Sequence, residues 1–379
     1  MLLPGGLEYA GGIGRWAGYL LDAWQVGKAA RPEIIVIDTR AHGGKAIGIL
    51  AFPLALLRLL GIFLSGRLAL IHANMASRGS TIRKSVVVYA AALFGVPVIV
   101  HLHGAQFDSF YLGLKPFYQR LVRGTFARAR TVLVLGEVWR RFLIDRVGVD
   151  EGKITILHNG VPQPRAPRRI PPPGAPCHIA LLGRLEPRKG VPELLSALGS
   201  APLRARAWRA TLAGDGDIEG TRRRAASLGQ ADRIAVPGWI SAADADALLA
   251  EADILVLASH AENMPMSVLE ALAHRVAVIA TTVGTTPEIL TDGFSVLLVP
   301  PGDVEALATA LVRLIDDPAC RDEIAAQGHD VFKRRLDIAI VADRLTALYL
   351  DCAPRLADGR DALARATGDS QSARSSGKS

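Results

Sequence analysis

The chain is poor in cysteine. Three are present among 379 residues, Cys177, Cys320 and Cys352, and their wide spacing matches no metal-ligand pattern. This excludes a disulfide scaffold and a zinc site built from cysteine pairs. It is typical of the reducing cytoplasm, where we expect the protein to be.

The amino terminus lacks the basic flank, apolar run and small-residue cleavage site of a secretory signal peptide. Its first residues, MLLP, instead resemble the clipped end of a β-strand, which leaves open a start upstream of Met1. One long apolar run occupies residues 47–64 and is interrupted by Arg58. Because a charge near the centre of a bilayer is costly, we predict a buried or interfacial helix there, opened by Pro53, rather than a membrane span.

Acidic residues are the minority among the charges. There are 36 Asp and Glu against 44 Lys and Arg, which leaves a net charge of +8. Such a balance favours anionic or phosphorylated partners. Nothing in the sequence points to nucleic acid.

Apolar β-forming segments are abundant. Half of the residues are hydrophobic and the mean hydropathy is +0.26, which suits buried parallel strands. Runs of this kind alternate with segments of helical length, the pattern of βαβ units in an α/β protein. The predicted strands are residues 33–37, 69–72, 97–101 and 131–135, then 178–182, 210–213, 254–257, 276–280 and 295–299.

A proline-rich stretch separates two such halves. We predict an N-terminal domain over residues 1–165, a linker over 166–176 and a C-terminal domain over 177–339. A helix at about 340–365 is expected to pack back on the first domain. Residues 366–379 are small and polar, and we expect disorder there.

The second half carries two glutamates that bracket seven residues, Glu262 and Glu270, directly after a predicted strand. Ligands of open α/β sheets bind at such strand ends. A carboxylate can accept from both hydroxyls of a ribose, and the start of a helix offers backbone N–H groups to a sugar or phosphate. Taken alone, the pair also fits an acid complementing a helix dipole and a solvated helix residue.

The same half begins with a basic loop, residues 182–190 (LGRLEPRKG). Arg184 and Lys189 could hold a diphosphate together, because guanidinium binds phosphate bidentately and ammonium acts as a mobile point charge. A solvated basic turn is the alternative.

Together these segments resemble the retaining glycosyltransferases of family 4, which pair a Gly-Arg-x4-Lys-Gly loop with a Glu-x7-Glu segment. Residues 158–162 (HNGVP), 214–216 (GDG) and 284–288 (GTTPE) match further pieces of the family pattern in the same order. The resemblance covers most of residues 10–345. It implies an α/β GT-B fold of two facing Rossmann-like domains with a cleft between them.

The resemblance also implies roles for single residues. Arg184 and Lys189 would bind the donor pyrophosphate, Glu270 the ribose, and Glu262 the transferred sugar as a catalytic group. The donor set implied by the motif is completed by Asn263, Met264, Pro265 and Met266. The family often has Phe-Gly where this chain has Asn263-Met264, so the donor sugar stays open.

Two Asp-x-Asp patterns, Asp215/Asp217 and Asp244/Asp246, suggest a metal-bound diphosphate only weakly. The first lies in a glycine turn, and Ser241 with Asp244 forms a capping-box pattern. Since two cations are already available, we predict no cofactor and no divalent metal requirement.

In the first half, Gly12 and Gly14 belong to a glycine turn that lets the backbone approach a ligand closely. The resemblance implies that this loop faces the donor phosphates or the acceptor, and a purely structural turn fits equally well. His101 and His103 point to one face of a strand by period two. We predict His103 as the catalytic histidine at the strand's end and His101 as a core residue. Asn74 and Arg78 could meet an anionic acceptor, although an ordinary polar loop fits equally well.

Residues 112–147 contain eight bases and two acids, with aromatic residues at 110, 111, 117 and 118. A basic, aromatic helix face of this kind can lie on an anionic membrane. We therefore expect peripheral contact with the inner face of the plasma membrane. A solvated basic helix with core aromatics is the alternative.

The combined prediction is transfer of a sugar from a UDP- or GDP-sugar to a saccharide acceptor, lipid-linked, in exopolysaccharide or lipopolysaccharide biosynthesis. A nucleotide-sugar epimerase of the same fold would instead form products from the donor alone. A catalytically silent binding protein would hold the donor without turnover. The nucleotide base, sugar, acceptor, linkage and oligomeric state are decided by few residues and stay open.

Overall fold

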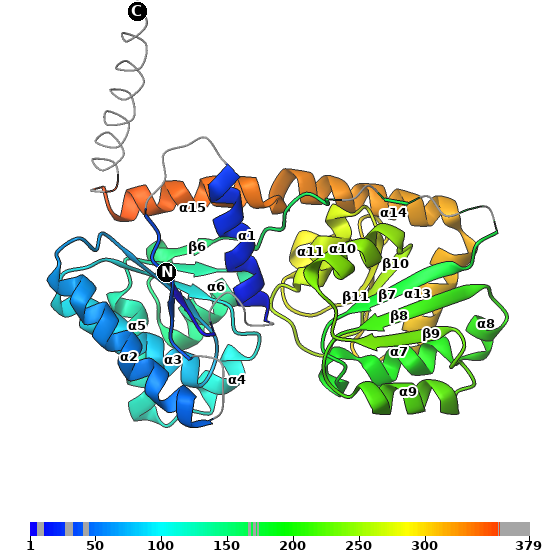
Figure 1. The fold of residues 1–379 in the computed structure, drawn as a ribbon, viewed down its shortest axis with the longest axis horizontal. Helices are drawn as coiled ribbons and strands as arrows, with labels where there is room; N and C mark the ends of the chain where they lie inside the picture. Colours follow the sequence, from blue (N-terminus) through cyan, green and yellow to red (C-terminus); the bar gives the residue numbers. More distant parts are fainter. Residues whose placement is uncertain are drawn as a thin grey trace, which may run out of the picture. The chain divides into compact units, whose positions relative to one another are not determined.

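The computed structural model describes residues 1–5, 11–26, 33–40, 45–165, 168–169, 172, 174–354 and 356. It divides into two compact units, one formed by Met1–His158 with Ala339–Ser379 and the other by Asn159–Ile338 (Figure 1). Residues 159–165, which the sequence analysis placed in the first domain, thus belong with the second unit. The predicted tail at 366–379 lies outside the described residues.

The first unit is built on a six-stranded parallel sheet. Its strands are β1 (Leu2–Leu3), β2 (Ile37–Asp38), β3 (Ile71–Met75), β4 (Val98–Leu102), β5 (Thr131–Val134) and β6 (Ile154–Ile156). Their order is β2-β1-β3-β4-β5-β6, so the direction of strand addition reverses between β1 and β3. The carboxyl ends of these two strands are where such a sheet binds ligands.

Helices cover both faces of this sheet (Figure 1). One face buries alternate strand residues such as Ala73, Val100 and Val132 under α2 (Lys45–Leu64), α3 (Gly79–Leu93), α5 (Pro116–Arg128) and α6 (Glu137–Phe142). The other face packs on α1 (Gly12–Val26) and α15 (Ile338–Cys352), whose Trp16 and Tyr349 contact His72. A short helix, α4 (Phe107–Leu112), follows β4.

The apolar run at 47–64 is a helix, as predicted, but Pro53 lies inside α2 and not at its start. The prediction was wrong on this point. The helix continues through Pro53 although the missing N–H of this residue costs one backbone hydrogen bond, because the apolar sequence on both sides is helical. Within the described residues, no helix has the length and apolarity needed to cross a membrane.

The second unit repeats the architecture. Its strands are β7 (Cys177–Leu182), β8 (Trp208–Ala213), β9 (Ile234–Gly238), β10 (Ile254–Leu257), β11 (Ala277–Thr281) and β12 (Leu297–Val299). All are parallel, in the order β12-β11-β10-β7-β8-β9. This is the order of dinucleotide-binding folds, with the reversal between β7 and β10.

Eight α-helices among the described residues of this unit connect and cover the strands. They are α7 (Val191–Leu198), α8 (Ala201–Arg204), α9 (Ile218–Ser227), α10 (Ala242–Glu251), α11 (Met266–Ala273), α12 (Thr286–Ile289), α13 (Val304–Asp316) and α14 (Pro318–Val331). The core contains fully buried aliphatic residues from the central strands, including Ile179, Ile254 and Ile279.

Some strand predictions need correction. Of the predicted strand 33–37, only Ile37 pairs in the sheet, and β2 continues to Asp38. The short β6 and the strand β9 were not predicted. β9 contains Pro237 and exposes alternate residues at the edge of its sheet, so it lacks the continuous apolar signal of a central strand.

The described part of the predicted linker is attached to the second unit. The backbone N–H of Arg169 donates to the carbonyl of Ala250 at 2.8 Å. The guanidinium of Arg168 donates to the carbonyl of Arg275 at 2.5 Å and pairs with Asp253 at 3.4 Å. Arg168 and Arg169 therefore attach part of the predicted linker to the second unit, which its proline-rich sequence did not indicate.

Candidate functional site

The point of reversal in the second sheet gathers the predicted donor residues. The loop after β7 carries Arg184 and Lys189, and the loop after β10 carries Glu262. Because β7 and β10 are neighbours, the two loops leave the same edge of the sheet side by side.

Lys189 and Glu262 form an ion pair across this edge. Nζ of Lys189 donates to Oε1 of Glu262 at 2.5 Å, and the two side chains are 17% and 10% exposed. Because both side chains are largely shielded from water, removing either partner would leave the other charge poorly solvated.

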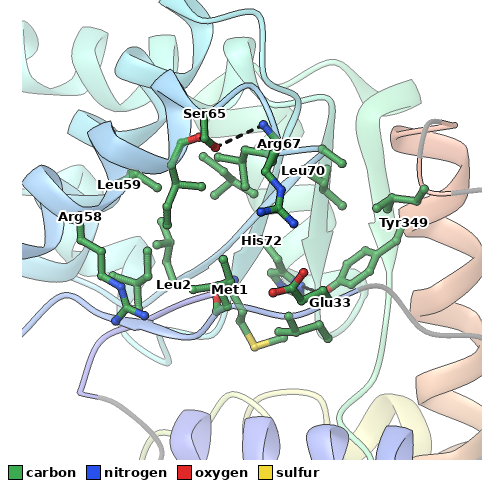
Figure 2. A pocket seen from close by; sticks show the side chains of 18 of the residues that line it. Met1, Leu2, Glu33, Arg58, Leu59, Ser65, Arg67, Leu70, His72 and Tyr349 are labelled. Atoms are coloured by element: carbon green, nitrogen blue, oxygen red, sulfur yellow. Dashed lines mark hydrogen bonds between the residues drawn. The ribbon is translucent and has the colours of Figure 1, made fainter. Parts of the chain in front are cut away.

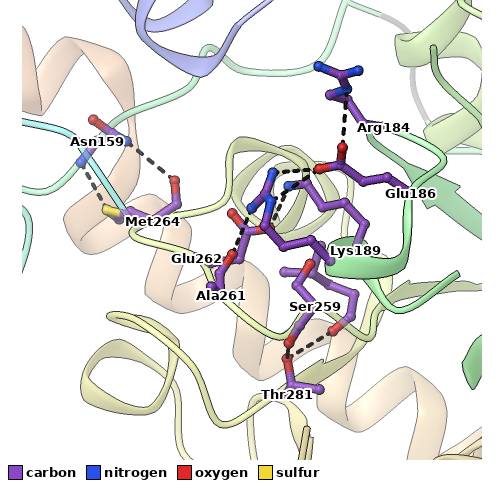
Figure 3. A network of polar contacts seen from close by, with 11 residues as sticks. Asn159, Arg184, Glu186, Lys189, Ser259, Ala261, Glu262, Met264 and Thr281 are labelled. Carbon is purple, nitrogen blue, oxygen red and sulfur yellow. Dashed lines mark hydrogen bonds and ion pairs between the residues drawn. The ribbon is translucent and has the colours of Figure 1, made fainter. Parts of the chain in front are cut away.

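Further contacts connect this pair to Arg184 (Figure 3). The guanidinium of Arg188 pairs with Glu186 at 2.8 Å and donates to the carbonyl of Ala261 at 3.0 Å. Glu186 in turn lies 3.6 Å from Nε of Arg184, which is more than half exposed. Arg188, which the sequence analysis did not single out, thus ties the basic loop to the residue before Glu262. Its position as a third base in that loop was the available signal.

Two glycines allow the loops to approach so closely. Gly190 has φ of 70°, and a Cβ there would overlap the carbonyl of Ala258. Gly284 has φ of 60°, and a Cβ there would overlap the carbonyl oxygens of Glu262 and Asn263. Both positions favour glycine, because their φ values are positive and because no room is left for a Cβ atom.

The residues after Glu262 are buried at the start of α11. Asn263, Met264 and Met266 are each less than 9% exposed, Pro265 is the residue before the helix, and Glu270 is buried inside it. Within the described structure, neither amide atom of Asn263 has a hydrogen-bond partner. An unpaired buried amide is unusual and marks a place where a ligand could supply the missing bonds.

Asn159 and Thr281 were not predicted and support these loops. The N–H of Asn159 donates to the sulfur of Met264 at 3.1 Å, and its amide nitrogen reaches the carbonyl of Met264 at 3.5 Å (Figure 3). The hydroxyl of Thr281 donates to the carbonyl of Ser259 at 2.6 Å. Both residues fix backbone next to the predicted site.

The carboxylates of the Asp-x-Asp patterns serve other contacts. Asp217 caps α9, and Ser241 with Asp244 forms the predicted capping box of α10. Asp215 lies 3.8 Å from Arg184, and Asp246 pairs with His274 at 2.8 Å.

In the first unit, His103 and Asn74 come together at the ends of adjacent strands. Nδ2 of Asn74 donates to the carbonyl of Leu2, so its Oδ1 faces Nε2 of His103 at 2.9 Å. An amide oxygen only accepts, so Nε2 of His103 carries the proton and Nδ1 keeps its lone pair. Desolvation lowers the pKa of His103 to about 3, which leaves the imidazole neutral at pH 7.

His103 belongs to a histidine cluster with His72 and His101, packed against Trp16. Nδ1 of His72 lies 2.6 Å from the hydroxyl of Tyr349, and Nε2 lies 3.2 Å from Nδ1 of His101. The rings of His101 and His103 are 4.0 Å apart, on one face of the sheet. Burial lowers the pKa values of His72 and His101 well below the ordinary value.

Gly12, Gly14 and Arg78, the other predicted site residues of this unit, take no part in the hydrogen bond between His103 and Asn74. Gly12 and Gly14 lie in the first turn of α1, not in a loop before it, with Gly14 buried and Gly12 exposed. Arg78 is exposed and precedes α3 with φ of 60°, an uncommon conformation for a side chain of this size.

A cavity of about 480 Å³ lies at the opposite, amino-terminal edge of this sheet (Figure 2). It is lined by apolar residues of β1, β3 and α2, and by polar side chains that include Arg58, Arg67, His72 and Tyr349. None of the predicted site residues lines it.

Two family models of known proteins match this chain. A family model described as glycosyl transferases group 1 matches residues 176–317, and one described as a glycosyl transferase 4-like domain matches residues 27–160. The chain belongs to family 4 of the glycosyltransferases. The two models correspond to the two structural units, and the strand orders with the structural neighbours described below establish the GT-B fold.

Three curated relatives illustrate the range of this family. The chain is 26% identical over 70% of its length to the phosphatidyl-myo-inositol mannosyltransferase of Mycobacterium leprae, covering 70% of that protein. It is 29% identical over 52% to the putative colanic acid biosynthesis glycosyltransferase WcaL of Salmonella typhimurium, covering 49% of it. With the alpha-D-kanosaminyltransferase of Streptomyces kanamyceticus it shares 26% identity over 45% of each chain. The chain thus spans about half the length of two of these relatives.

Solved structures share the fold at lower identity. A sucrose-phosphate synthase from Thermosynechococcus elongatus superposes with a TM-score of 0.73 at 19% identity, over 90% of this chain and 94% of that one. HepE of Anabaena, in complex with UDP, gives 0.67 at 20% identity, over 83% and 85%.

Proposed function

We propose that this glycosyltransferase moves a sugar from a UDP- or GDP-sugar to a saccharide acceptor with retention of anomeric configuration. The observation that carries the proposal is the partly buried Lys189–Glu262 pair at the point of strand reversal. It sets a cation for the diphosphate beside a carboxylate for the sugar. HepE was solved with UDP, so UDP heads the donors to be tested.

Departure of the nucleoside diphosphate requires positive charge close to its phosphates. Lys189 is nearly buried, and Arg184 is exposed with weak contacts to Glu186 and Asp215. A diphosphate would replace these carboxylates as the partner of both cations. Positive charge beside the leaving group stabilises it without a covalent step.

The sugar and ribose would be held by the segment after β10. Glu262, released from Lys189, accepts hydrogen bonds from sugar hydroxyls, and the unpaired amide of Asn263 can both donate and accept. Met264 and Met266 bring backbone N–H groups to the start of α11, whereas Pro265 between them has no N–H and can only shape the turn into the helix. Glu270, on the same helix, is proposed to accept from the ribose hydroxyls.

His103 is proposed as the reacting group of the first unit. Its neutral ring presents Nδ1 as an acceptor while Asn74 holds the protonated Nε2. Such a group can orient a hydroxyl, and it can take up a proton only if a developing charge raises its pKa. Gly12, Gly14 and Arg78 remain predictions as ligand contacts in this unit.

We propose a lipid-linked saccharide as acceptor, in exopolysaccharide or lipopolysaccharide biosynthesis. WcaL supports a pathway of this kind by its name, and the mannosyltransferase of M. leprae is named for a phosphatidyl acceptor. The basic segment at 112–147 supports contact with an anionic membrane. No cofactor is required in this proposal, and turnover should survive a chelator because Arg184 and Lys189 supply the charge.

The test is release of nucleoside diphosphate from a panel of UDP-, GDP-, ADP- and CMP-linked sugars, with and without membrane extract as acceptor source. The proposal predicts release that depends on extract, with a product of retained configuration by NMR. Release of a modified nucleotide sugar without any acceptor would indicate an epimerase. Donor binding with no turnover under any condition would contradict the proposal.

A further inference from the structure

Three helices of the first unit, α2, α3 and α5, lie side by side over one face of the sheet (Figure 1). Their outward side chains form an apolar surface. We call this surface the outer helix face. Its exposed apolar side chains are Leu54, Leu57, Leu60 and Leu64 of α2, Ile82, Val86 and Leu93 of α3, and Phe117, Tyr118 and Leu121 of α5.

α2 is apolar on two sides. Ala55, Leu59 and Phe63 are buried and pack toward the sheet. Leu57 and Leu64, seven residues apart, are 65% and 72% exposed on the opposite side. Since the sheet is already covered by the first side, the second has no role in the core.

α3 and α5 continue the surface. Ile82, Val86 and Leu93 follow the spacing of one helix face, and Ile82 is 63% exposed. The hydroxyl of Tyr89 on α3 donates to the carbonyl of Leu121 on α5 at 3.2 Å, so these exposed rows are adjacent. At the other side, Phe63 of α2 stacks on Phe94, directly after α3, with ring centroids 4.6 Å apart.

The charges around this surface are almost all of one sign. Residues 45–130, which contain all three helices, include a single acid, Asp108. The bases of the same stretch are Lys45, Arg58, Arg67, Arg78, Arg83, Lys84, Lys115, Arg120, Arg123, Arg128 and Arg130. Lys84 is fully buried, where it donates to Thr39, and adds no charge to the surface. Arg58 and Arg120 are exposed among the leucines and aromatic residues of α2 and α5.

We propose that the outer helix face lies on an anionic lipid bilayer. Leucines and aromatic rings enter the boundary of head groups and acyl chains, while the arginines meet lipid phosphates. A second copy of the chain would bring the same basic surface against itself, and like charges repel. A bilayer accepts a long apolar row without matching its shape and supplies the opposite charge.

The membrane contact itself does not depend on the proposed function. Only its benefit does, since the contact would bring the enzyme to a lipid-linked acceptor. It extends the contact from the segment 112–147, which contains α5, to the exposed apolar rows of α2 and α3. The outer helix face does not include any residue of the donor site.

The experiment is co-sedimentation of the full chain with vesicles of phosphatidylglycerol and phosphatidylcholine, and with phosphatidylcholine alone. We expect binding to the anionic vesicles that weakens as salt screens the charges. The double variant Leu57→Gln, Leu64→Gln should bind at least about tenfold more weakly, because both changes fall on exposed apolar positions. Arg58→Gln, Arg120→Gln should lose about tenfold or more on anionic vesicles.

Matched controls replace exposed apolar residues, or exposed arginines, of the second unit. Trp239→Gln, Phe294→Gln replaces two exposed aromatic residues, and Arg223→Gln, Arg224→Gln lowers the net charge by the same amount as the test variant. Both controls should bind vesicles like the wild type. All variants change exposed side chains, and thermal melting followed by circular dichroism should show them folded.

Three results would overturn the inference. These are no vesicle binding by the wild type, equal binding by the leucine variant, and a wild-type dimer that the leucine variant converts to a monomer without any vesicle binding. UDP binding is measured in parallel. Vesicle binding without UDP or GDP binding would leave this inference standing and contradict the proposed function.

Discussion

Asn263 combines burial with an amide that lacks partners among the described residues. An arrangement of this kind costs the folded protein about 1–3 kcal/mol, so it persists where a ligand uses it. We predict that Asn263→Leu leaves the free energy of unfolding unchanged or raises it by about 1 kcal/mol, and lowers donor turnover at least about tenfold. Urea unfolding and nucleotide release measure the two effects. A variant that is destabilised but fully active would show that the amide has a structural role only.

Gly284 leaves room for the carbonyl groups of Glu262 and Asn263. Gly284→Ala adds a clash with backbone to the cost of a positive φ, so we expect a loss of at least about 2 kcal/mol of stability and reduced donor turnover. Gly293 has φ of 70° with open space around it and is the matched control. Gly293→Ala should cost about 1 kcal/mol and keep turnover. Equal unfolding energies for the two variants would refute the close packing.

The buried histidines make stability depend on pH. Burial holds the pKa values of His72, His101 and His103 below the ordinary 6.5, so below that pH the unfolded chain binds protons that the folded protein does not. The free energy of unfolding should therefore fall as pH drops from about 6.5, and recover as pH rises. His101→Gln should reduce the difference between pH 6 and pH 5 by about 1 kcal/mol.

Denaturant unfolding at the two pH values measures this difference. His260→Gln, which removes an exposed histidine, controls for the change in composition. A pH dependence of His101→Gln identical to that of the wild type would contradict the neutral cluster.

At the scale of elements, two helices of the second unit begin with serine but differ in capping. Ser241 accepts from the N–H of Asp244 in a capping box, whereas Ser200 makes no side-chain cap and its hydroxyl has no partner within the described part of the unit. Ser241→Ala should cost about 1 kcal/mol of unfolding free energy, and Ser200→Ala should cost much less. The order is checked by thermal unfolding, and a reversed order would show that the caps do not set the stability of these helices.

Elements with a continuous apolar signal could be predicted from the sequence. The strands that became β3, β4, β5, β7, β8, β10 and β11 were found within about three residues because parallel strands buried on both faces are apolar throughout. The edge strand β9 was missed because solvent faces half of it. Gly12 and Gly14 were predicted in a loop, since glycine near a strand end fits a turn as readily as the first turn of a helix.

For the candidate site, the motifs placed Arg184, Lys189 and Glu262 at strand ends, and strand order brought them together. Their pairing could not be predicted, because which cation meets which acid depends on loop conformations set by distant contacts. Arg188 bonding to the carbonyl of Ala261 is one such contact. The bonding between Asn74 and His103 likewise depends on the order of β3 and β4, which local sequence does not specify.

At the scale of the whole molecule, each unit carries its own sheet, its own point of strand reversal and its own polar cluster at that edge. The second unit has cations balanced by acids, and the first has neutral histidines. This division suits a reaction in which one unit must hold a charged diphosphate and the other an uncharged hydroxyl. The basic outer helix face of the first unit adds a separate route to an anionic surface.

The proposed donor site requires that Arg184 and Lys189 bind the same diphosphate. Calorimetric titration of UDP and GDP into the wild type, Arg184→Met, Lys189→Met and the distant control Arg223→Met tests this directly. We predict that the wild type and the control bind one nucleotide equally, and that each site variant binds it at least about tenfold more weakly while remaining folded. Binding that is unchanged in both site variants, or absent in the wild type, would contradict the account.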